Sequence, residues 1–79
     1  MYLCVDGFLL DSTEDDSLQF ELEINRSLTE EIVKLLGHRS INAMAAGQWR
    51  LSDEQITQLS SIIGHSLPTD LKLFIGVEA

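Results

Sequence analysis

The hydrophobic positions in the first third of the chain follow the period of two that is typical of strands. Apolar and polar residues alternate strictly over residues 18–25, with apolar positions at Leu18, Phe20, Leu22 and Ile24. We expect a strand there with one buried face. Two shorter apolar runs, 2–5 and 8–10, are separated by Asp6-Gly7, a dipeptide that favours the positive φ angles of a tight turn. The sequence therefore predicts an N-terminal β-hairpin, which the strand at 18–25 extends into a meander.

After residue 26 the apolar spacing changes to about 3.6 residues, the period of an amphipathic helix. This spacing predicts four short helices, at 27–36, 40–46, 52–63 and 68–75, each followed by a glycine. The first and third of them begin with a serine that is followed three residues later by Glu or Gln, the spacing of a capping box. The last one contains Pro68 in its first turn, where a missing N–H group costs nothing.

Together these patterns predict a single α+β domain over residues 1–79. A β region occupies residues 1–25 and contains an acidic loop at 11–17. A helical region with four short helices occupies residues 27–76.

Length and composition limit the class of protein. A chain of 79 residues has a small hydrophobic core and buries only ~60% of its unfolded surface, so we expect a homodimer. A single cysteine, Cys4, excludes an intramolecular disulfide and is typical of proteins in a reducing compartment. Because the chain has no signal-peptide pattern and no apolar run near the ~20 residues of a membrane span, we expect a cytoplasmic protein without a membrane partner.

The chain offers few groups for catalysis or metal binding. His38 and His65 each lie beside a glycine that ends a predicted helix, and their spacing matches no catalytic or metal-ligand motif. Cys4 lies in an apolar run, as a small buried residue would. Glycine-rich phosphate loops are absent from the sequence. The sequence therefore predicts a protein that is not an enzyme and has no cofactor, metal or small-molecule substrate.

Charge is divided unevenly along the chain, whose formal net charge is −8. Residues 1–31 contain nine acidic residues and one basic residue, whereas residues 32–52 contain three basic residues and no acidic one. The second segment is therefore cationic, and it also contains amide and hydroxyl side chains that can contact phosphates or base edges. This pattern makes residues 32–52 a candidate nucleic-acid contact.

Three segments also follow the element order of a known family: LTEEIVKLLG at 28–37, INAMAAG at 41–47 and LSDEQITQLSSIIG at 51–64. They resemble the helix-turn-helix domains of the Cro and lambda-repressor-like family. The resemblance extends over 28–75 and implies a helix-turn-helix-like arrangement in which 41–47 lies in the major groove. It implies groove contacts from Arg39, Ser40, Asn42, Ala43 and Ala46 and phosphate contacts from Gln48 and Arg50, and the charge pattern adds Lys34. The first hypothesis is therefore a DNA-binding transcriptional regulator or antitoxin-like repressor, with duplex DNA as its partner.

The acidic residues support a second hypothesis, a small inhibitor of the immunity, antitoxin or phage-inhibitor type that binds a basic protein partner. Opposite charges on two partners accelerate their association. The residues expected to form this surface are Glu14, Asp15, Asp16, Glu21 and Glu23.

The aromatic residues are assigned mainly to the core. We expect Tyr2, Phe8 and Phe20 in the core of the sheet. Trp49 either packs in the core between the second and third predicted helices or lies exposed in a binding surface.

Overall fold

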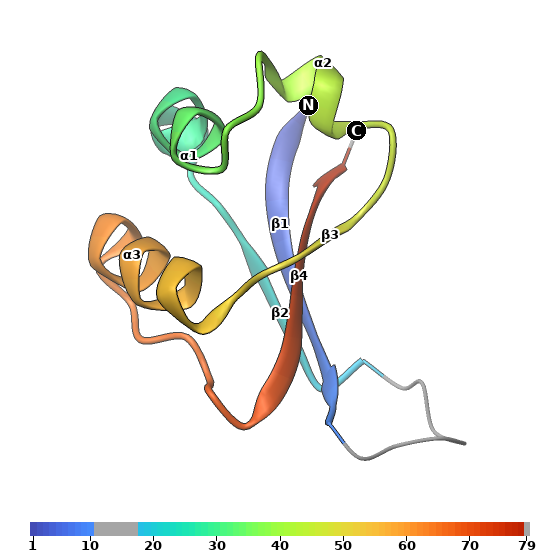
Figure 1. Ribbon diagram of the computed structural model, residues 1–79, viewed down its shortest axis with the longest axis vertical. Coiled ribbons are helices and arrows are strands. Elements are labelled where there is room, and N and C mark those ends of the chain that lie inside the picture. Colours follow the sequence, from blue (N-terminus) through green and yellow to red (C-terminus); the bar gives the residue numbers. More distant parts are fainter. Residues whose placement is uncertain (11–17, 79) are drawn as a thin grey trace.

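The computed structural model describes residues 1–10 and 18–78 and contains one antiparallel sheet (Figure 1). Its strands are β1 (Tyr2–Leu9), β2 (Phe20–Glu23), β3 (Trp49–Arg50) and β4 (Leu71–Glu78), arranged in the order β2-β1-β4-β3. The two long strands pair along their whole length, from Tyr2 opposite Glu78 to Leu9 opposite Leu71. They form the centre of the sheet, and the short strands β2 and β3 lie at its edges.

Helical segments connect these strands. They are the 3₁₀ turn η1 (Arg26–Leu28) and the α-helices α1 (Thr29–Leu35), α2 (Ile41–Met44) and α3 (Asp53–Ile63). In Figure 1, α1 and α3 lie on the same side of the sheet, and α2 lies at the end where β1 begins and β4 ends. The fold is α+β, but in the described residues four strands and three α-helices replace the expected three-strand meander and four helices in a helix-turn-helix-like arrangement.

The hydrophobic core lies between one face of the sheet and the helices. Alternate residues of the central strands, among them Leu3 and Val5 of β1 and Leu73 and Ile75 of β4, are fully buried or nearly so. Helical residues complete the cluster, with Ile32, Val33, Met44, Ile56 and Leu59 all buried. Because successive residues of a strand point to opposite faces, the residues between these core positions point away from α1 and α3.

The predicted hairpin at Asp6-Gly7 is wrong, because β1 runs through both residues without a turn. Gly7 does not have a positive φ angle. A Cβ atom at this position would lie 3.0 Å from side-chain atoms of Leu71, Leu73 and Phe20, so crowding between three strands favours the glycine. The dipeptide therefore reflects close packing rather than a turn.

The predicted helix at 68–75 is also wrong, since most of this segment lies in strand β4. Its apolar residues Leu71, Leu73, Ile75 and Val77 fit a period of two as well as a helical period. Pairing with all eight residues of β1 satisfies the backbone of the segment and buries Leu73 and Ile75. A ladder of this length, formed between the two ends of the sequence, outweighs the local helix signal.

The predicted helix at 52–63 is confirmed as α3, and local signals define both of its ends. The Ser52 side chain accepts a hydrogen bond from the backbone of Gln55, and the Gln55 side chain accepts one from the backbone of Ser52, so the predicted capping box forms. Gly64 ends the helix with a left-handed φ of 73°. The corresponding box at Ser27 does not form, because η1 intervenes and Asn25 caps it instead.

The other predicted elements are shorter than expected. Strand β2 covers the middle of the alternating segment 18–25, and α2 covers four residues of the predicted helix at 40–46. Ser40 caps α2 by accepting a hydrogen bond from Ala43. The predicted acidic loop at 11–17 lies outside the described residues.

Candidate functional site

The face of the sheet opposite α1 and α3, which we call the open face, carries the charged side chains of the strands together with three aromatic rings. Directly paired residues of an antiparallel sheet share a face, so the strand register defines which side chains lie there. The register places on the open face Tyr2, Cys4, Asp6 and Phe8 of β1, Glu21 and Glu23 of β2, Arg50 of β3, and Lys72, Phe74, Gly76 and Glu78 of β4.

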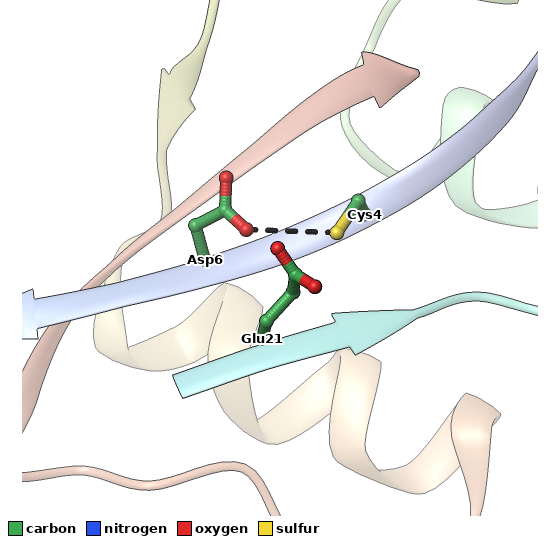
Figure 2. Close-up of side chains that lie close together, drawn as sticks. All are labelled: Cys4, Asp6 and Glu21. Atoms are coloured by element: carbon green, nitrogen blue, oxygen red, sulfur yellow. Dashed lines mark hydrogen bonds between the residues drawn. The ribbon is translucent and has the colours of Figure 1, made fainter. Parts of the chain in front are cut away.

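Three of these side chains converge near the centre of the open face. Figure 2 shows Cys4 and Asp6 of β1 together with Glu21 of β2. The Cys4 Sγ atom donates a hydrogen bond to Asp6 Oδ1 over 3.5 Å. The Sγ atom and one carboxylate oxygen from each acidic residue all lie within 4.8 Å of one another. A thiol and two carboxyl groups are thus held together by the pleat of β1 and by its pairing with β2.

Burial distinguishes the members of this cluster. Cys4 is 3% exposed and Asp6 is 9% exposed, whereas Glu21 is exposed to solvent. Among the described residues, no lysine, arginine or histidine forms an ion pair with Asp6. A carboxylate this deeply buried normally has a cationic partner or a metal ion.

A fourth side chain, Gln48, contacts Asp6 across strand β4, from the edge of the open face where β3 lies. Its Nε2 atom donates a hydrogen bond to Asp6 Oδ2 over 3.3 Å. To reach Asp6, Gln48 passes Gly76 of β4, where an added Cβ atom would lie 3.2 Å from Gln48 Cγ. Each Asp6 oxygen therefore has one hydrogen-bond donor, and the absence of a side chain at Gly76 leaves space for the second donor.

The environment keeps the Cys4 thiol protonated. Burial raises its pKa from 9.0 to about 12, and the charge of Asp6 and its hydrogen bond with the thiol act in the same direction. Without a bound cation, Cys4 is therefore a neutral thiol near neutral pH and a poor nucleophile.

Charged and aromatic side chains surround this cluster. Glu21 and Glu23 are exposed on the edge strand β2, while the basic residues Lys72 and Arg50 belong to β4 and β3 on the other side of the sheet. The open face is therefore acidic along its β2 edge, whereas its β4 and β3 half carries both basic residues and the exposed Glu78.

Half-buried aromatic rings lie on the same face. Phe8 and Phe74 contact each other edge to face, with ring centroids 5.9 Å apart. The Tyr2 ring lies 5.9 Å from the Arg26 guanidinium, a cation–π arrangement. The expectation that Tyr2 and Phe8 belong to the core of the sheet is wrong, whereas Phe20 is half-buried and packs against the core.

The structure brings together three of the residues predicted to bind DNA. Lys34, Arg39 and Ser40 line a pocket of about 320 Å³ between α1 and the start of α2. Glu30 also lines this pocket, which reduces its positive character.

The other predicted DNA contacts do not line this pocket. Asn42, Ala43 and Ala46 are exposed on or just after α2. Gln48 is hydrogen-bonded to Asp6, and Arg50 lies opposite Phe74 on the open face.

Of the residues predicted to bind a protein, Glu21 and Glu23 lie on the open face, and Glu14, Asp15 and Asp16 lie outside the described residues. Trp49 is 39% exposed, and its indole nitrogen donates a hydrogen bond to the Met44 carbonyl over 3.1 Å. Its ring also stacks at a tilt against His38, with centroids 4.7 Å apart. Trp49 therefore packs at the surface, with one part held by its neighbours and another part in solvent.

Sequence reasoning missed the roles of Asp6, Gln48 and Gly76. A weak signal was present, since Cys4 and Asp6 are two positions apart and share a face in any continuous strand. Because a turn was predicted at Asp6-Gly7, Cys4 and Asp6 were not assigned to one continuous strand.

Comparisons with known proteins add no relative: no family model, curated protein or solved structure matches the chain. The resemblance to Cro and lambda-repressor-like domains stays a prediction. Within the described part of the chain, no helix has the length and apolar character needed to cross a membrane.

Proposed function

We propose that this protein is a small, non-enzymatic module that binds a basic protein partner through the acidic edge of its open face. The observation that carries the proposal is the position of Glu21 and Glu23, which project from the edge strand β2 beside the buried cluster of Cys4 and Asp6. Two exposed carboxylates at adjacent positions of one strand face offer a compact contact for Lys or Arg side chains.

The rest of the molecule supports this proposal. The formal net charge is −8, and residues 1–31, which include β1 and β2, carry nine acidic residues and one basic residue. The resulting field attracts a basic partner towards this half of the sheet and accelerates the encounter. The half-buried rings of Phe8 and Phe74 add apolar contact area, since aromatic residues are enriched in protein interfaces.

Geometry supports duplex DNA as a partner less well. The helix that the resemblance assigns to the major groove, α2, contains four residues. Lys34 and Arg39 line the pocket beside α1, whereas Arg50 belongs to the edge strand β3 and lines a different pocket, so no single pocket gathers the three cations.

The chain has a single cysteine, Cys4, and its thiol is buried and free, which is typical of proteins in a reducing compartment. We therefore propose that the protein functions in the cytoplasm.

Charge reversal tests the proposal. The double variant Glu21→Lys with Glu23→Lys changes the acidic edge, and Glu30→Lys with Glu31→Lys makes the same change in net charge at exposed positions of α1. We expect the protein to bind a short Lys- and Arg-rich peptide in fluorescence anisotropy, more tightly at about 50 mM than at about 200 mM salt. The first double variant weakens binding about tenfold or more, because two attractions become repulsions, and the second weakens it much less.

Equal loss of binding in both double variants overturns the proposal, because net charge alone would then explain the affinity. The same assay with duplex DNA tests the rival hypothesis. DNA binding that survives the change at Glu21 and Glu23 but disappears in Arg39→Glu with Arg50→Glu would support the regulator instead. Light scattering on these samples measures the mass and tests the predicted homodimer.

A further inference from the structure

We propose that Cys4, Asp6 and Glu21 form a binding site for one zinc ion on the open face. This inference goes beyond the proposed binding of a partner, because it assigns a cation to the buried centre of the face. It rests on the geometry of the three donors, the uncompensated charge of Asp6 and the side chain that orients Asp6.

The donor atoms are close to the arrangement that zinc requires. Tetrahedral zinc with Zn–S near 2.3 Å and Zn–O near 2.1 Å places its ligand atoms roughly 3.3–3.7 Å from one another. Cys4 Sγ and Asp6 Oδ1 are already 3.5 Å apart, and the oxygen of Glu21 lies within 4.8 Å of both. Glu21 makes no hydrogen bond or ion pair with the described residues and is exposed, so rotation of its side chain brings the third donor into place.

The buried charge of Asp6 is an independent argument for a cation. Asp6 is only 9% exposed, and no described basic residue forms an ion pair with it. Burying a carboxylate without a cation is costly, and proteins that retain such a group usually pair it or use it to bind metal. Glu21 brings a second carboxylate to Asp6, which increases the need for positive charge at this point.

Gln48 gives the site the outer hydrogen bond that metal-binding carboxylates commonly have. The Gln48 amide donates a hydrogen bond to Asp6 Oδ2, and Asp6 Oδ1 is the oxygen that faces Cys4 Sγ. The contact depends on Gly76, since a Cβ atom there would crowd Gln48. Four segments of the chain therefore contribute to the cluster: β1, β2, the residue before β3, and β4.

The donor types favour zinc over calcium and magnesium. Calcium and magnesium prefer oxygen ligands alone, whereas zinc binds thiolate and carboxylate together. When the Sγ–Zn bond forms, the thiol proton passes to solvent, and the thiolate supplies the electron pair. Three protein ligands leave the fourth tetrahedral position for water.

Metal titration of the full chain, freed of metal with a chelator, tests the inference. We expect zinc chloride to bind with one ion per chain in competition with a chromogenic chelator. Cobalt chloride, used as a spectroscopic substitute, should give the near-ultraviolet charge-transfer absorption that shows a thiolate ligand. Zinc should also raise the melting temperature, because an ion that binds the folded state stabilises it.

Three variants identify the ligands. Cys4→Ser and Glu21→Gln should each weaken zinc binding at least tenfold, and Cys4→Ser should also remove the cobalt absorption. Glu23→Gln is the matched control, because Glu23 lies opposite Cys4 in the register but outside the cluster, and we expect its zinc affinity to change less than twofold. Glu21 is exposed, so Glu21→Gln should fold like the wild type even if Cys4→Ser does not.

Several results would overturn the inference. They are the absence of zinc binding at micromolar protein, a cobalt spectrum without the thiolate absorption, and equal weakening in Glu23→Gln and Glu21→Gln, which would indicate diffuse attraction to an acidic surface. The peptide assay is carried out in chelator and does not depend on zinc. Failure of one proposal is therefore distinguishable from failure of the other.

Discussion

At the scale of single residues, Asp6 shows why local sequence did not predict the candidate site. An Asp-Gly dipeptide is locally typical of a turn, and nothing in the local sequence shows that the Asp6 carboxylate is buried. Its main partner beyond the strand, Gln48, lies 42 positions further along the chain, and no local pattern reveals that contact. Glu21 was predicted to be on a strand and exposed, which the structure confirms, but its proximity to Cys4 and Asp6 follows from the pairing of β1 with β2.

Gly7 gives a residue-scale prediction about packing. A Cβ atom at Gly7 would lie 3.0 Å from side chains on two neighbouring strands, so we expect Gly7→Ala to lower the free energy of unfolding by about 1–3 kcal/mol. Gly47 is the control, because nothing lies within 4 Å of its Cβ position and its φ is not positive. Gly47→Ala should be neutral or slightly stabilising. Urea denaturation measures both, and equal stability of the two variants would contradict the packing argument.

At the scale of elements, the sequence predicted best where the determining contacts are local. The capping box and the final glycine of α3 lie within the helix and its caps, so the sequence contains the whole signal. Strand β4 depends on pairing with β1, at the opposite end of the chain. Its apolar residues fit both periods, and only the tertiary partner decides between them.

The two serines of the predicted capping boxes give a matched pair of variants. The Ser52 side chain caps α3, so Ser52→Ala should lower the free energy of unfolding by about 1 kcal/mol. The Ser27 hydroxyl makes no hydrogen bond with the described residues, and Ser27→Ala should change stability by less than about 0.5 kcal/mol. Thermal melts followed by circular dichroism measure the difference. A larger loss from Ser27→Ala would show that its predicted box contributes after all.

At the scale of the whole molecule, the sheet collects negative charge and buried titratable groups on one face. Cys4 is held protonated by burial and by Asp6, and the pKa of Tyr2 is raised by desolvation and by the nearby charges of Glu23 and Glu78. Both groups become anions when they lose their protons, within a chain whose formal net charge is already −8. The folded state therefore resists deprotonation more than the unfolded state does, and stability is linked to alkaline pH.

The direction of this linkage follows from the two pKa values of Cys4. The thiol has an ordinary pKa of 9.0 when unfolded and a pKa of about 12 when folded. Between these values the unfolded state has lost a proton that the folded state keeps, so the free energy of unfolding falls as pH rises through this window. Below pH 9.0 the stabilisation is complete, and it is progressively lost towards pH 12.

We expect the melting temperature, measured in chelator, to fall between about pH 9 and pH 12, and to fall less steeply in Cys4→Ser. The variant should retain part of the slope, because Tyr2 still has a raised pKa. The comparison uses the difference between the two profiles, so a constant loss of stability in Cys4→Ser does not affect it. Parallel profiles would mean that the Cys4 thiol is not held in its neutral form by the fold, and that the electrostatic description of the cluster is wrong.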